Sequence, residues 1–336
     1  MKKYFSYSSV LFTLGFIFII KPAITHAQNK ISIDNGYFIT NPDKLMLTFF
    51  VLQKFAPFTI SADGNNNELN YKTNSKLNLG VGVTYRGFTV NLSYGFSFLN
   101  KDNGQGATKG LDVQFHLFPN KWAIDLLGTF RKGYYLDPKD NNGLRLATFY
   151  QRPDVKRDII GFSFFRVPNS AKFSYKAALT QIDWQTKSAG SLLYGGEFYY
   201  GLVEGDSALV PSRANNNFLQ AGINKINFFS IGPGVGYAYT LVIDKNYFIT
   251  GSVVGTLDIN YSTEDRASGK YNKFSLLPGG IYKGAIGYNS SSWSISANST
   301  GNLLYAGSKS SAKEYFLPTG NFRFILAKKI GLKQRK

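Results

Sequence analysis

Six polar side chains on two neighbouring predicted strands form the most reactive set in this chain. The strands cover residues 111–118 and 122–131, and alternation gives each strand one apolar and one polar face. The polar residues are Asp112, Gln114 and His116 on the first strand, and Asp125, Thr129 and Arg131 on the second. Of the two histidines, His26 lies in the first 27 residues. Any histidine-dependent acid–base mechanism must therefore use His116.

Two interpretations fit this set. In the first, His116 and Arg131 neutralise Asp112 and Asp125, because unpaired charges inside a narrow barrel are costly. In the second, His116 belongs to a lipid hydrolase, a class of barrel enzyme that places a Ser–His pair on adjacent strands facing the lipid. Here His116 is predicted to face the interior. We therefore favour a polar network in the lumen and predict no catalytic residue.

Other motifs have simpler explanations than chemistry. Residues 63–68 and 137–143 superficially resemble calcium loops, but turns rich in Asn, Asp and Gly explain both, and Lys139 stands where an oxygen ligand is needed. Lys187 and Ser188 could form a Ser–Lys pair, although a tight turn with Gly190 in an unusual conformation explains them better. Residues 232–236 lack the strand-to-helix context of a nucleotide loop. No metal or cofactor is expected.

The elements that carry these residues are clearest in residues 77–98. Apolar and polar residues alternate over 77–85, reverse at 86–87 and alternate again over 88–98. A water-exposed sheet usually carries charged side chains, so a small neutral face suits a confined interior and an aromatic-rich face suits lipid. The small face provides space in the lumen, and its residues are Gly80, Gly82, Ser93, Gly95 and Ser97.

The pattern predicts an all-β fold, a transmembrane antiparallel β-barrel of about 14 strands, with 12 as the alternative. Further strands are predicted at 159–167, 173–184, 192–203, 234–243, 247–261, 274–288, 293–304 and 316–327. Short turns, such as 86–87 and 168–170, alternate with longer loops at 100–108, 133–158, 262–273 and 306–313. The alternation fails at 204–232, and the raw tally of about 15 strands is odd, whereas bacterial barrels have even counts. One assignment is therefore wrong, and we expect the error near residues 45–61 or 218–234.

The beginning of the chain predicts export. Lys2 and Lys3 precede an apolar stretch that is too short to span a membrane, and a small-residue site follows at Ala27. We predict a signal peptide at 1–27, an N-terminal segment at 28–43, the barrel at 44–328 and a basic tail at 329–336. The absence of cysteine excludes disulfides and thiolate metal sites.

The charge of the chain bears on its partners. Removing residues 1–27 takes away three lysines and no acidic residue, which lowers the formal net charge from +18 to +15. Because an exported protein seldom meets nucleic acid, we expect none as a partner and expect outer-membrane lipid and lipopolysaccharide instead. Solvation of the loops by lysines explains the charge equally well. The outer-membrane insertion machinery is a further expected partner.

Several segments resemble an outer-membrane β-barrel family of Bacteroidota-type bacteria that is catalogued as a domain of unknown function. They are residues 41–45, 77–85, 92–100, 131–136 and 187–191. The resemblance implies location in the outer membrane and a barrel fold, without an established activity. The chain departs from the aromatic ending that is usual in outer-membrane strands, since residues 325–336 follow Phe324 and end in Lys-Gln-Arg-Lys.

Three functions fit these observations. The first is a passive conduit or carrier for a small or lipophilic molecule of unknown identity. The second is a structural or surface-interaction barrel that binds anionic lipid or polysaccharide through its basic loops. The third is a lipid-modifying enzyme, which we rank last.

Overall fold

The computed structural model describes residues 33–40, 44–64, 67–85, 88–100, 103–119, 121–141, 144, 147–214 and 218–331. The predicted signal peptide, residues 28–32 and 41–43 of the N-terminal segment, the reversal at 86–87 and residues 332–336 of the tail lie outside them. The described residues belong to the compact unit Ser32–Lys336. None of the helices in this part of the chain is long and apolar enough to cross a membrane.

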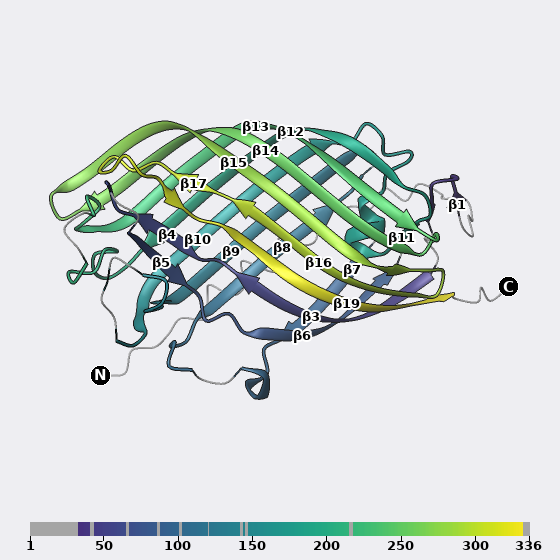
Figure 1. The fold of residues 1–336 in the computed structure, drawn as a ribbon, viewed down its shortest axis with the longest axis horizontal. Coiled ribbons are helices and arrows are strands. Elements are labelled where there is room, and N and C mark those ends of the chain that lie inside the picture. The colour runs from purple at the N-terminus through teal and green to yellow at the C-terminus, as the bar shows by residue number, and fades with distance from the viewer. Residues whose placement is uncertain are drawn as a thin grey trace, which may run out of the picture. The chain divides into compact units, whose positions relative to one another are not determined.

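One antiparallel sheet of 16 segments forms the wall of the barrel, and Figure 1 shows its long strands running obliquely side by side. The segments are β3 (Lys44–Phe55), β4 (Phe58–Ser61), β5 (Glu68–Lys72), β6 (Leu77–Tyr85), β7 (Phe88–Tyr94), β8 (Lys109–Leu117), β9 (Trp122–Leu136), β10 (Tyr150–Arg166), β12 (Ala189–Glu204), β13 (Ile223–Ile243), β14 (Tyr247–Arg266), β15 (Gly269–Asn289), β16 (Trp293–Leu303), β17 (Tyr305–Ala306), β18 (Tyr315–Phe316) and β19 (Thr319–Gly331).

Several consecutive segments are parts of one pass through the wall. β3 pairs with β19, and β4 pairs with β18 in the same register. β16 pairs with β19, and β17 pairs with β18, again in one register. β5 and β6 pair with β4 and β3 one residue out of step, which marks a β-bulge. Joining β3 with β4, β5 with β6, β16 with β17 and β18 with β19 leaves 12 passes. The wall therefore has 12 passes, which is the alternative that the sequence predicted, rather than 14.

The wall strand predicted at 173–184 is wrong. The segment between β10 and β12 turns into the barrel instead, with a π-helix η4 (Lys176–Thr180) and a short strand β11 (Asp183–Gln185). Phe173 and Tyr175 are buried against inward-facing wall residues. Removing this strand from the wall makes the number of passes even. It also moves the polar segment at 205–222 to the end of the barrel that carries the long loops.

Other boundaries differ because strands extend past the expected loops. β9 and β10 reduce the predicted loop at 133–158 to residues 137–149, and β14 and β15 replace most of the loop at 262–273. The predicted strand 88–98 ends at Tyr94, and Ser97 begins the 3-10 helix η3 (Ser97–Leu99). β19 continues to Gly331, so residues 329–331 belong to the barrel rather than to a tail.

The outward-facing side chains form an apolar belt. On β13 and β14, exposed Val235, Val253 and Ile259 alternate with buried inward residues such as Thr240 and Thr250. Aromatic rings flank the belt, with Tyr261 against Phe274 towards the long-loop end and Tyr247 against Tyr288 towards the short-turn end. Apolar and aromatic bands of this kind are typical of a wall in lipid. The predicted transmembrane antiparallel β-barrel is confirmed.

Two strand glycines test how tightly the wall packs. At Gly80 an added Cβ would overlap the Phe50 ring and lie 2.7 Å from the Leu92 carbonyl oxygen, whereas at Gly251 nothing lies within 4 Å. We expect Gly80→Ala to lower the free energy of unfolding by about 1–3 kcal/mol, as overpacking does. Gly251→Ala is the matched control and should leave stability unchanged. Urea unfolding in micelles, followed by tryptophan fluorescence, measures both, and equal midpoints would contradict the packing at Gly80.

Candidate functional site

One carboxylate joins three strands inside the barrel. Asp125 on β9 lies opposite His116 on β8 in the strand register, and its Oδ1 is 2.5 Å from His116 Nδ1. Its Oδ2 is 2.5 Å from the Nζ of Lys283, which comes from β15. Asp125 and Lys283 are largely buried, and the His116 side chain is one-third exposed. The triad therefore neutralises charge that would be costly to leave unpaired.

A second carboxylate forms a similar cluster nearer the long-loop end. Asp112 contacts the Arg131 guanidinium and lies 2.9 Å from Lys54 Nζ. Gln114 accepts a hydrogen bond of 3.2 Å from Asn321. Thr129 lies opposite Asp112 in the register, and its buried hydroxyl has no hydrogen-bond partner among the described residues.

The structure thus brings five of the six predicted polar residues into contacts in the lumen, with Thr129 beside them. Sequence reasoning missed the partners Lys54, Lys283 and Asn321, because they come from β3, β15 and β19. A signal was present in the alternation, since Lys283 and Asn321 stand at inward positions of their strands.

The chemistry available to His116 is limited. Its hydrogen-bond partner is a carboxylate, and no serine hydroxyl in the described part of the chain contacts it. A cavity of about 30 Å³ lies beside His116, Asp125 and Lys283. A cavity of this volume holds water rather than a substrate.

A pair of acidic residues that the sequence analysis did not single out lies deeper in the lumen. Glu197 on β12 accepts hydrogen bonds from Thr256 (2.8 Å) and Tyr199 (3.3 Å), and Asp258 on β14 accepts one from Ser230 (3.0 Å). Both carboxyl groups are buried. Gly279 leaves room where they meet, since a Cβ there would lie 3.1 Å from Glu197 Oε1 and 3.3 Å from Asp258 Oδ2.

The residues of the predicted small face have different surroundings in the structure. The space above Gly80 and Gly82 is filled by the Phe50 ring and the Asn91 side chain, and Gly95 lies against Asn78. Ser93 is exposed. Ser97 was assigned to the wall wrongly, because the strand ends at Tyr94 and Ser97 lies in η3.

The segment between β10 and β12, residues 167–188, forms a plug at the short-turn end. The Tyr175 hydroxyl lies 2.6 Å from Ser252 Oγ on the wall. Asn298 donates a hydrogen bond of 3.2 Å to the Leu179 carbonyl, and Asn289 donates one of 2.9 Å to the Asp183 carbonyl. The ammonium group of Lys283 lies 5.2 Å from the centre of the Tyr175 ring. These polar contacts add to the apolar packing of Phe173, Tyr175 and Ala178 against the wall.

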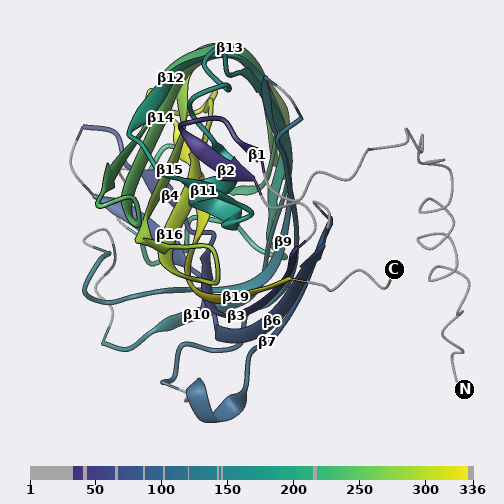
Figure 2. The same ribbon diagram turned by 90° about the vertical axis from the view of Figure 1, so that its right-hand side faces the viewer.

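Two N-terminal strands hold the plug from outside. β1 (Ile33–Asp34) and β2 (Phe38–Thr40) form a three-stranded sheet with β11, in which Thr40 pairs with Asp183. Lys172 and Lys187 lie over the ring of Tyr37. Figure 2 looks at this end and shows β1, β2 and β11 across the opening.

The long-loop end is closed by different chemistry. Loop residues Leu144, Leu209, Val210 and Phe218 are buried with inward-facing Phe58 and Phe228 in one apolar cluster. In the described part of the chain, loop residues thus fill the long-loop end and the plug fills the short-turn end.

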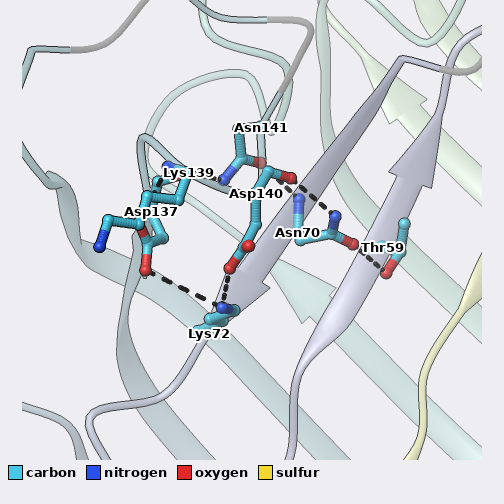
Figure 3. A network of polar contacts seen from close by, with 7 residues as sticks. All are labelled: Thr59, Asn70, Lys72, Asp137, Lys139, Asp140 and Asn141. Atoms are coloured by element: carbon cyan, nitrogen blue, oxygen red, sulfur yellow. Dashed lines mark hydrogen bonds and ion pairs between the residues drawn. The ribbon is translucent and has the colours of Figure 1, made fainter.

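The loop that resembles a calcium site holds a lysine. Lys72 contacts Asp140 and lies 4.0 Å from Asp137, while Asn141 accepts a hydrogen bond of 2.7 Å from the Asn70 amide (Figure 3). Burial alone would lower the pKa of the Lys72 ammonium, but its hydrogen bond and charge interaction with Asp140 raise that pKa overall. The carboxylates are therefore occupied by an internal cation.

The proposed turn at 187–191 is also wrong. Gly190 lies within β12 opposite Tyr239, without a positive φ. Ser188 Oγ accepts a hydrogen bond of 2.9 Å from the Val242 amide, and Lys187 lies over Tyr37, so the two do not form a Ser–Lys pair. In the other loop that resembles a calcium site, Asp63 accepts hydrogen bonds from Ser311 and Ala312.

An apolar outer face, a polar inner face and antiparallel passes define the class of this protein as a transmembrane β-barrel of the outer-membrane type, closed inside. The chain belongs to the family described as domain of unknown function DUF4421, whose profile matches residues 32–325. A comparison with curated proteins found no match.

Solved structures give weak similarities. The outer membrane protease OmpT from Escherichia coli shares 10% identity at a TM-score of 0.34, covering 89% of this chain and 100% of that one. A mutant of the monoaromatic hydrocarbon channel TodX shares 7% identity at a TM-score of 0.26, covering 87% of this chain and 91% of that one. The outer membrane protein OprG from Pseudomonas aeruginosa shares 10% identity at a TM-score of 0.23, covering 89% of this chain and 100% of that one. The activities in these names belong to those proteins.

The Asp125 triad predicts a graded set of stabilities. Asp125→Asn leaves Lys283 buried without a counter-charge, so we expect a loss of about 3 kcal/mol in the free energy of unfolding. The double variant with Lys283→Met should recover part of that loss, and His116→Ala, at a more exposed partner, should cost less than about 1 kcal/mol. Urea midpoints in micelles give all three values. A double variant less stable than Asp125→Asn would contradict the ion pair.

Proposed function

We propose that this chain is exported, inserts into the outer membrane, and acts as a closed carrier for a small or lipophilic molecule. In this function the lumen receives the molecule and the plug releases it at the short-turn end. The expected partners are outer-membrane lipid, lipopolysaccharide and the insertion machinery.

The observation that carries this proposal is the plug. A segment of the wall connection turns inward and closes one mouth, although a short turn would have joined β10 to β12 at less entropic cost. Apolar side chains of the plug, among them Phe173, Tyr175 and Ala178, pack against the wall, and hydrogen bonds of Tyr175, Leu179 and Asp183 add to this packing. The apolar cluster at the opposite mouth is much larger. The plug is therefore the end more easily opened.

The alternatives have less support. Two lysines at the long-loop end that could bind an anionic surface, Lys156 and Lys225, already lie 3.7 Å and 3.4 Å from Glu204. A Ser–His hydrolase would need a serine beside His116, and no serine contacts it in the described part of the chain. We accordingly propose no enzymatic role.

Transfer of a fluorescent lysophospholipid across proteoliposome membranes tests the carrier. The full chain should accelerate transfer above protein-free vesicles, and Tyr175→Ala should raise the rate several-fold further, because it removes the ring and the hydroxyl that contact the wall. Tyr194→Ala is the matched control, since Tyr194 is exposed on the lipid-facing side of β12, and it should leave the rate unchanged. Transfer no faster than in protein-free vesicles, for both the full chain and Tyr175→Ala, would falsify the proposal.

A further inference from the structure

The wall of the barrel has one break. In the described part of the chain, β7 pairs with β6 and β8 pairs with β9, but no pairing joins β7 to β8. The other neighbouring passes are hydrogen bonded to each other around the barrel. We call the gap between β7 and β8 the window.

The window is closed on its long-loop side. There β5 pairs directly with β9, with Tyr71 opposite Leu136. The connection from β7 to β8 is anchored to this closure, because Asn100 exchanges hydrogen bonds with the Leu77 backbone and Asn74 bonds to Thr108 and Gly106. These contacts fix the corner where the two strands separate.

The outer lips of the window are apolar. Leu92 and Tyr94 on β7 are 70% and 68% exposed, and Leu111 and Phe115 on β8 are 63% and 55% exposed. Side chains of this kind belong to the apolar belt of the wall. The window therefore opens towards lipid rather than towards water.

Behind the lips the two strands differ in chemistry. The side of β6 and β7 carries Gly80, Gly82, Asn91 and Ser93, and inward-facing Asn91 and Ser93 are exposed, unlike the buried inward residues of β13 and β14. The side of β8 carries Asp112, Gln114 and His116. Phe50 and Asn91 fill the space above Gly80 and Gly82, so it is the exposed inward side of β7 that leads to the ion-paired clusters.

Charge at the inner rim favours an anion. Lys54 and Arg131 share Asp112, and Lys283 and His116 share Asp125, so the permanent cations outnumber the carboxylates. Meanwhile, unpaired backbone N–H and C=O groups on the two strand edges are costly in hydrocarbon. A molecule with a polar, phosphate-bearing headgroup and an acyl chain satisfies both conditions.

We propose that the window is a lateral entrance through which a phospholipid-like amphiphile reaches the lumen. Its headgroup passes to the rim formed by Lys54, Arg131 and Lys283, and its acyl chain stays between the apolar lips. This inference rests on the proposed carrier function, for which it names the substrate class and the route.

Quenching of a fluorophore by lipid tests the window, and the absence of native cysteines gives single-site labelling. Bimane is attached to the full chain at Gln114→Cys, or at Asn91→Cys on the opposite lip, in vesicles containing phospholipid with a nitroxide on its acyl chain. Phe115→Cys faces the lipid and is the positive control. Ser296→Cys, at a buried inward position of the continuous strand β16, is the negative control.

We expect the Gln114 and Asn91 labels to be quenched several-fold more than the Ser296 label and nearly as much as the Phe115 label. Protection equal to that of Ser296 would overturn the window. Quenching that appears only after the protein is diluted in lipid would overturn it too, because the gap would then be an interface between two copies.

The headgroup is tested with the same labels. Nitroxide-labelled phosphatidylglycerol should quench the Gln114 label more than nitroxide-labelled diacylglycerol does, and Lys54→Gln should reduce the difference. Equal quenching by the two lipids overturns the headgroup assignment. Quenching at Gln114 without lysophospholipid transfer would support the window and contradict the carrier. Transfer with a Gln114 label that is protected from quenching would support the carrier and contradict the window.

Discussion

The structure depends on one constraint, which is that hydrocarbon offers no partner to a backbone N–H or C=O group. Long registers between β12, β13, β14 and β15, with one shift near Ile223, satisfy it. The same constraint explains why β3 and β4 keep one register across a break, and why β5 and β6 absorb their mismatch in a bulge. It also makes the unpaired edges of β7 and β8 the exception that calls for a function.

Inside the wall the constraint concerns side chains. A buried charge must find a counter-charge, and Asp112 and Asp125 each serve two cationic or polar partners from different strands. The two mouths are closed by different parts of the chain, loop residues in a large apolar cluster at the long-loop end and the plug, held by apolar packing and hydrogen bonds, at the short-turn end. In the proposed carrier, this asymmetry gives the barrel a direction, with lipid entering at the window and release at the plug.

Alternation along the chain predicted the class of fold, the lipid-facing residues and the pairing partners His116 and Asp125, because period two is a local property of a strand. The same property misled at residues 173–184. Phe173 and Tyr175 alternate with polar neighbours just as a wall strand would, but they pack against the inside of the wall. The misplaced segment at 204–232 came from that error. Removing one strand makes the tally of about 15 even, and joining consecutive segments into single passes accounts for the lower count of 12.

The sequence by itself determined that this protein is a barrel with an apolar outer face and an inner face of small, polar residues, because alternation assigns each strand residue to one of the two faces. Only the tertiary structure decided that β7 and β8 stay apart, that residues 167–188 close the lumen, and that Lys54 and Lys283 complete the clusters of Asp112 and Asp125. Such contacts join residues up to 158 positions apart. No local pattern encodes them, because they depend on which strands the closed wall brings face to face.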